Sequence, residues 1–155
     1  MMAKSFSRLL VALTAGIAAT IAHAAEPVAP AGLAVFDKQC AACHQAGGKG
    51  MPGLAPALAG TLAAAVASDD GRRYLAQVLI HGLSGRIVSQ GQTFNGAMPG
   101  QFALSDAELA DVANYLARDL NGAASPVFGP EDFVRARAPK PSHKELRELR
   151  ERLPK

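Results

Sequence analysis

Residues 40–50 read CAACHQAGGKG, and this stretch holds both cysteines of the 155-residue chain. Two alanines separate Cys40 from Cys43, and His44 follows at once. One helical turn spans about 3.6 residues, so a helix through this segment would bring both thiols and the imidazole close together. The pattern therefore predicts a site built from two thiols and one imidazole.

Four kinds of site use a Cys-x-x-Cys pair. A structural zinc site needs four ligands, but His81 and His143 are far away in sequence and have no second ligand beside them. A redox dithiol expects a βαβ neighbourhood, which the pattern lacks, and a disulfide that closes so small a loop would stabilise little. The fourth interpretation is favoured: C-x-x-C-H is the signal for covalent attachment of haem c through Cys40 and Cys43, with His44 on the iron.

The N-terminus predicts export. Lys4 and Arg8 precede an apolar run, and Ala22-His23-Ala24 fits a cleavage site, so residues 1–24 are interpreted as a signal peptide. The alternative is an uncleaved anchor, but the run is shorter than the roughly 20 apolar residues that span a bilayer. We therefore expect a periplasmic protein with no membrane span after cleavage.

Charge and composition argue against a nucleic-acid partner and indicate a boundary between two parts of the chain. The formal net charge is only +3, and neither a dense basic run nor an aromatic platform indicates nucleic acid. Glycine, serine and proline cluster in residues 122–130. We expect a haem domain over residues 25–122, followed over residues 123–155 by a linker and a charged, helical C-terminal tail.

Hydrophobic periodicity predicts helices over residues 30–44, 68–82 and 105–122. Ser105 and Glu108 have the spacing of a capping box at the start of the third helix. Residues 85–96 alternate weakly and could form one small hairpin. The expected class is all-α, and the long loops between so few helices leave space for a large apolar cofactor.

A second iron ligand is predicted from the methionines. A chain that starts at residue 25 has only Met51 and Met98. Met51 follows His44 too closely to reach the opposite face of a haem, whereas Met98 lies 54 positions after it and is flanked by Gly96 and Gly100. Filling of the core is the alternative role for either methionine, and ligation is favoured for Met98.

Residues 30–122 resemble the class I monohaem cytochromes c. The resemblance depends on the order of several features: Gly32 and Phe36 before CAACH, GLAPALAG after it, a middle helix, FNGAMPG, and a last helix with Tyr115. It implies three to four helices around one haem, with the N- and C-terminal helices crossing.

The resemblance also implies roles for further residues. The carbonyl of Pro56 would accept a hydrogen bond from His44, Leu58 would pack on the haem, and Phe94 would lie near the Met98 loop. The implied function is periplasmic electron transfer with exported dehydrogenases, oxidases or reductases as partners.

Two other functions stay open. The chain could be the haem c subunit of an exported oxidoreductase complex, held there by its tail. A five-coordinate haem enzyme or gas sensor is the other alternative, and Met98 argues against it. In the tail, Ser142 and Glu145 predict a helix whose only apolar stripe is Leu146, Leu149 and Leu153. That helix is either solvated or docks on a partner.

Overall fold

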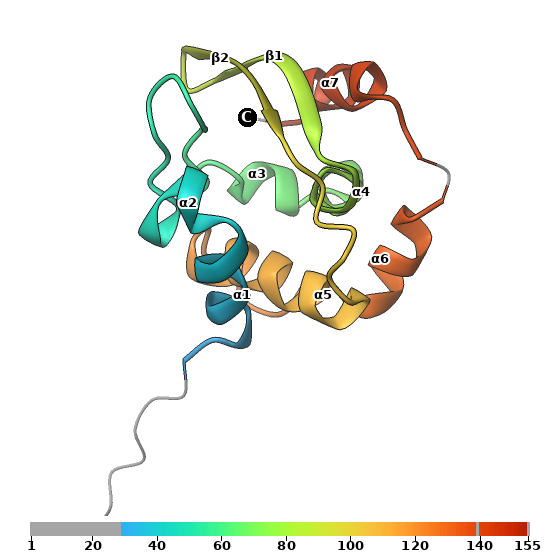
Figure 1. Cartoon of the computed structure of the whole chain (residues 1–155). Coiled ribbons are helices and arrows are strands. Elements are labelled where there is room, and N and C mark those ends of the chain that lie inside the picture. Colours follow the sequence, from blue (N-terminus) through green and yellow to red (C-terminus); the bar gives the residue numbers. More distant parts are fainter. Residues whose placement is uncertain (1–28, 139, 155) are drawn as a thin grey trace, which may run out of the picture.

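The computed structural model describes residues 29–138 and 140–154, and this part of the chain is mainly helical (Figure 1). The predicted leader, residues 1–24, lies outside the described residues. In chain order the elements are α1 (Ala31–Gln39), α2 (Ala41–His44), the 3-10 turn η1 (Ala46–Gly48), α3 (Ala63–Val66), α4 (Asp69–His81), β1 (Leu83–Ser89), β2 (Gln92–Met98), α5 (Asp106–Asn114), the π-helical turn η2 (Tyr115–Asp119), α6 (Pro130–Ala136) and α7 (His143–Arg152). None of the helices over residues 29–138 and 140–154 is both long enough and apolar enough to cross a membrane.

One small two-stranded antiparallel sheet accompanies the helices, at the place where the sequence allowed a hairpin. β1 and β2 pair from Leu83 opposite Met98 to Ser89 opposite Gln92. Gln90 and Gly91 connect them with φ values of 48° and 75°, as a two-residue type I′ turn requires. Most side chains of both strands are partly or fully exposed, which explains why the sequence alternates only weakly here. The hairpin places Met98 beside Leu83, directly after the end of α4.

The first helix packs against α5 through a glycine. A Cβ atom on Gly32 would overlap the carbonyl oxygen of Asp111, so only glycine permits this approach. One turn later, Phe36 is fully buried, and its ring centroid lies 5.3 Å from that of Tyr115. The contact between the N-terminal helix and the last predicted helix therefore forms where the sequence indicated it.

Residues 30–44, which the sequence predicted as one helix, form two, α1 and α2. α1 ends at Gln39, and Cys40 has φ −116°, outside the regular helical range. The backbone N–H of His44 still donates to the carbonyl of Cys40 at 2.9 Å, which keeps one tight helical turn around the two cysteines. Gln45 then has φ 61° and turns the chain toward the glycines that follow.

Side-chain caps fix the two long helices that follow. The hydroxyl of Ser68 accepts from the backbone N–H of Gly71 at 3.1 Å and starts α4, which ends where Gly82 has φ 75°. The capping box predicted for Ser105 and Glu108 is present at the start of α5. The predicted third helix does not continue as α-helix beyond Asn114, because the chain widens there into η2.

The C-terminal helices pack on the rest of the fold. α6 contacts α4 and α5, and α7 contacts α4 and β1, as the side-by-side ribbons show (Figure 1). Phe133 of α6 is fully buried in the main apolar cluster. The leucine stripe of α7, which the sequence left free for solvent or a partner, is buried against Tyr74, Val78 and Leu83.

Candidate functional site

The two cysteines lie in different environments: Cys40 joins α1 to α2, and Cys43 lies within α2. Both are free thiols; Cys40 is buried and Cys43 is exposed. Burial, with a smaller effect of Cys43, raises the pKa of the Cys40 thiol to about 11. The Cys40 thiol is therefore protonated at neutral pH. Cys40 packs in the apolar core, whereas the thiol of Cys43 is accessible to solvent.

The imidazole of His44 is oriented by the backbone of a later loop. Its Nδ1 lies 2.9 Å from the carbonyl oxygen of Pro56. A carbonyl oxygen only accepts, so Nδ1 carries the proton of the neutral ring and Nε2 keeps its lone pair. Burial lowers the pKa of His44, and the bond to Pro56 partly offsets this effect. The neutral form with a free Nε2 is the form that ligates a metal.

Glycines let the loop after His44 fold back on itself. The backbone N–H of Leu58 donates to the carbonyl of Gly48 at 2.8 Å, and that of Gly50 donates to the carbonyl of His44 at 2.8 Å. Gly48 and Gly50 have φ values of 69° and 74°, and a Cβ on Gly50 would overlap the backbone of Ala57. This compact loop is what carries the Pro56 carbonyl back to His44.

Asn121 connects the same loop to the end of the helix predicted over residues 105–122. Its Nδ2 donates to the carbonyls of Leu58 and Leu116 at 2.9 and 2.8 Å, and its Oδ1 accepts from the N–H of Leu62 at 2.8 Å. The sequence analysis missed this residue, since an Asn next to Gly122 is an ordinary signal for a helix end. Its contacts with Leu58 and Leu62 span about 60 positions and become visible only in the fold.

The two methionines differ in burial: Met98 packs against the core, whereas Met51 lies at the surface. Met98 ends β2, is half-buried, and packs against both apolar clusters. Met51 is 37% exposed and belongs to a short turn bridged to Ala55. Cys40 and Leu58 meet the same main cluster as Met98, so three of the predicted site residues contact one apolar core.

Phe94 occupies a neighbouring place on β2. It is buried, stands opposite Ile87 in the hairpin, and lines a hollow of about 170 Å³ together with Met51, Ala55 and Ala57. Ala55 and Ala57 are the chain neighbours of Pro56. Phe94 is therefore near the His44 loop as well as on the strand that ends at Met98.

A larger hollow, of about 580 Å³, lies between residues 60–65, the hairpin and α7. Arg86, Arg147 and Arg150 line it, against one carboxylate, Glu151. Within the described residues, none of these three arginines forms an ion pair. The hydroxyl of Tyr74 lies 3.5 Å from Arg150 at the same hollow. A hollow of this size with cationic walls suits a ligand that ends in carboxylates.

Arg86 lies on β1, whereas Arg147 and Arg150 lie on α7. Arg72 and Arg73 of α4 pair with Asp69 and Asp70. Arg147 and Arg150 were missed because their helix was expected to stand apart from the domain. Their spacing of three places both on one face of α7, which was the available signal.

These donors fit haem c better than the other interpretations of Cys-x-x-Cys. Across the described residues, no three His, Cys, Asp or Glu side chains gather as a metal-binding group, so a four-ligand zinc site is not formed there. The sheet is one antiparallel hairpin, without the βαβ unit of a redox dithiol. Two thiols, an oriented imidazole, a thioether and cationic walls match the vinyl groups, iron and carboxylates of a haem.

Comparison with known proteins identifies the class. The cytochrome c family profile matches residues 29–118, more than half of the chain. The chain therefore belongs to the cytochrome c family, whose members carry covalently attached haem c.

Two relatives come from one organism. The chain is 47% identical over 79 residues to cytochrome c-552 of Thermus thermophilus, covering 51% of this chain and 60% of that protein. Identity to the cytochrome c-552 of a named strain of the same species is also 47% over 79 residues, covering 53% of that protein. The match thus spans between about half and three-fifths of the length of these relatives.

Proposed function

We propose that this protein is a periplasmic one-electron carrier with a haem c held by thioether bonds to Cys40 and Cys43 and ligated by His44 and Met98. The observation that carries the proposal is the hydrogen bond of 2.9 Å between His44 Nδ1 and the Pro56 carbonyl, directly after the two thiols. It leaves Nε2 for an iron and increases the basicity of the ring.

The surrounding residues orient the cofactor and exclude water. When bound, haem supplies an iron that alternates between the ferrous and ferric states. Leu58 and Phe94 would present apolar side chains to the porphyrin, which would lower the local dielectric and stabilise the less charged ferrous state. Arg86, Arg147 and Arg150 line the larger hollow and would offer opposite charge to the carboxylates of the haem.

The number of iron ligands that the protein supplies decides between an electron carrier and a haem enzyme. An iron held by both His44 and Met98 would have no open coordination site, so it would pass electrons without binding a substrate. Electron transfer is therefore favoured over a five-coordinate enzyme or gas sensor. The alternative that the chain is a subunit of an oxidoreductase complex has less support, because the leucines of α7 that could have contacted a partner are buried within this chain.

Export completes the proposal. Residues 1–24 would direct the chain to the periplasm and be removed, and the partners there would be exported dehydrogenases, oxidases or reductases. Covalent attachment suits this location, since a haem bound by two thioethers is retained outside the cytoplasm. Mass spectrometry of the exported protein should show a chain that starts at Ala25.

The ligand assignment is tested by two matched methionine variants. Met98→Ala should abolish the weak far-red charge-transfer band of ferric iron bound to a thioether, open the ferrous iron to carbon monoxide, and lower the reduction potential. Met51→Ala should leave all three properties unchanged, because Met51 lies on an exposed turn. The opposite pattern would show that Met51 is the ligand, and a wild type without the band that binds carbon monoxide would refute the electron carrier.

A further inference from the structure

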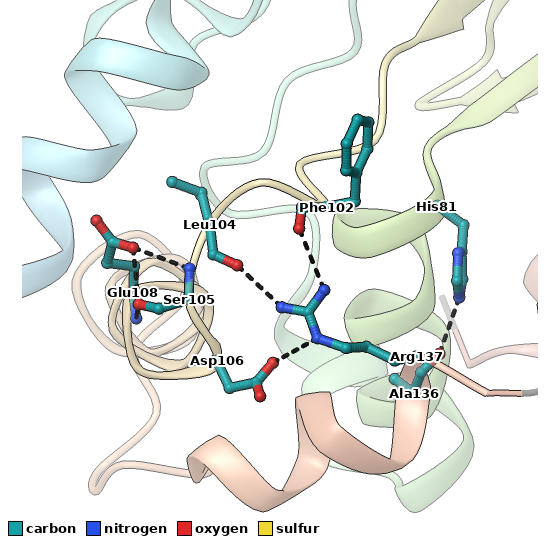
Figure 2. A network of polar contacts seen from close by, with 8 residues as sticks. All are labelled: His81, Phe102, Leu104, Ser105, Asp106, Glu108, Ala136 and Arg137. Carbon is teal, nitrogen blue, oxygen red and sulfur yellow. Dashed lines mark hydrogen bonds and ion pairs between the residues drawn. The ribbon is translucent and has the colours of Figure 1, made fainter.

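Arg137, the residue that ends α6, reaches across to the start of α5 (Figure 2). Its Nε donates to Oδ1 of Asp106 at 2.8 Å, its Nη1 to the carbonyl of Phe102 at 3.2 Å, and its Nη2 to the carbonyl of Leu104 at 2.9 Å. All three guanidinium nitrogens are used, and the ion pair with Asp106 is only about one-third exposed. A planar fork with several donors is what an arginine offers and a lysine does not.

The two carbonyls belong to the loop that leads away from Met98. Residues 99–105 connect β2 to α5, so this loop begins directly after Met98, which is itself paired with Leu83 of β1. The Met98 end of this loop is held by α4: the N–H of Gln101 donates to the carbonyl of Leu79 at 2.7 Å. A Cβ on Gly82 or Gly100 would overlap the opposing backbone, so the two segments touch directly.

The far end of the loop has one apolar anchor, because Leu104 packs against the main apolar cluster. The side chain of Phe102 is 73% exposed, so burial of that ring does not hold residue 102 in place. The carbonyl of Phe102 is instead held by Arg137, and that of Leu104 is held by the same guanidinium. Arg137 thus adds a polar restraint on residue 102, whose ring is exposed, and on residue 104, whose side chain is packed.

Arg137 is itself fixed by the fold. Phe133, one helical turn earlier on α6, is fully buried. Nε2 of His81 on α4 lies 2.8 Å from the carbonyl of Ala136, the residue before Arg137 (Figure 2). The restraint therefore connects the loop to two helices, α4 and α6, which are themselves packed together.

We infer that Arg137 is a positioning residue that holds the loop of residues 99–105 closed and so keeps the Met98 thioether on the iron. The inference rests on the proposed ligation by Met98. A thioether is displaced only when its loop opens, and the population of the open state depends on the local contacts that opening breaks. Arg137 lies outside the part of the chain that matches the cytochrome c family, residues 29–118.

The test measures how readily imidazole replaces Met98 on the ferric iron of the intact holoprotein. The apparent affinity for an added ligand rises in proportion to the fraction of open protein. Loss of the charge-assisted bonds of Arg137 should raise that fraction by about tenfold or more. We therefore expect Arg137→Ala to bind imidazole about tenfold more tightly, as followed by loss of the iron–thioether band.

Two further variants separate this role from general destabilisation. Arg135→Ala is the matched control, since Arg135 pairs with Asp132 on its own helix; it should bind imidazole within about twofold of the wild type. Arg137→Lys keeps a charge beside Asp106 but cannot fork to both carbonyls, so it should resemble Arg137→Ala. All proteins are compared at a temperature where their far-UV circular dichroism coincides, and Arg137→Lys provides the result if Arg137→Ala does not fold.

The outcomes are distinct. Imidazole affinities that match the wild type in both Arg137 variants would overturn the inference while leaving ligation by Met98 intact. An equal gain in Arg135→Ala would also overturn it, because the effect would then be common to α6. A wild-type protein without the iron–thioether band would refute the proposed ligation itself, before any variant is compared, and the inference with it.

Discussion

Residues 31–122 and the described part of residues 123–154 join one fold by different kinds of contact. In the first region, backbones approach each other through glycines: a Cβ on Gly32 would overlap Asp111, and a Cβ on Gly50 would overlap Ala57. In the second region, large side chains make the contacts. Phe133 is fully buried, and Leu146 is 1% exposed.

The difference explains why only one region could be understood from motifs. Close backbone approach requires glycine at a fixed position, so Gly32 and the glycines after His44 mark their sites in the sequence. A leucine or phenylalanine in the sequence, by contrast, predicts burial but does not indicate which segment packs against it. The family match ends at residue 118, yet the helices beyond it complete both apolar clusters.

The largest expected effect concerns attachment in the first region. Replacing Cys40 and Cys43 together with alanine should abolish covalently bound haem, because no other cysteine exists in the chain. The amount of covalently bound haem is measured as the haem that stays with the protein through acid-acetone extraction and denaturing electrophoresis. Ala42→Ser, at an exposed position between the two thiols, should retain it. Recovery of covalent haem from the double variant would refute the attachment site.

The second prediction tests whether residues 123–154 are integral to the fold. Phe133→Ala should lower the free energy of unfolding by about 3–5 kcal/mol, because it leaves a cavity in the main cluster. Val134→Ala is the control, since Val134 is 60% exposed and its change should stay within about 0.5 kcal/mol. Chemical denaturation of the holoprotein measures both. Equal, small effects would mean that this region is a dispensable tail.

The features that the sequence predicted are those set by residues close to one another. The caps at Ser105 and Ser142 each join positions three apart. The bond between His44 and Pro56 spans twelve positions within one loop, and the resemblance implied it. That geometry is present, while the ligand role of His44 stays a prediction.

The features that the sequence could not predict depend on the tertiary fold. Arg137 contacts residues 31 to 35 positions earlier, and Arg147 donates to Ser84, 63 positions earlier. No local pattern names the distant partners of Arg137 or Arg147. Hydrophobic periodicity likewise did not predict the break between α1 and α2 at Cys40 or the change from α-helix to π-helix at Tyr115.

A smaller effect is expected at the arginines that the second region brings to the larger hollow. Arg150→Gln should lower the reduction potential by some tens of millivolts, because a positive charge near the haem favours the ferrous state. Arg152→Gln is the matched control on the same helix; Arg152 is exposed and does not line the hollow. Spectroelectrochemical titration at low salt measures the difference. Equal potentials in both variants would show that the hollow does not face the haem carboxylates.

The smallest expected effect compares one capping box from each region. Glu108 accepts from the hydroxyl and N–H of Ser105 at 2.7 and 2.9 Å, and Glu145 accepts from those of Ser142 at 2.7 Å each. The serine hydroxyl is the main cause that lowers the pKa of each carboxyl below 4.5. A lowered carboxyl pKa stabilises the folded state above the unfolded value, and this stabilisation is lost as the pH falls through the folded value.

Glutamine at either position removes that titration, so the unfolding temperature should fall less between neutral pH and about pH 3.5 in Glu108→Gln and in Glu145→Gln than in the wild type. Both carboxyls are exposed and their bonds have nearly equal lengths, so the two changes should be similar and small. Scanning calorimetry at the two pH values measures them. If only Glu108→Gln altered the pH dependence, α7 would melt before the core does, and the buried leucine stripe would not couple it to global unfolding. Similar effects would place both helices in a single cooperative unit.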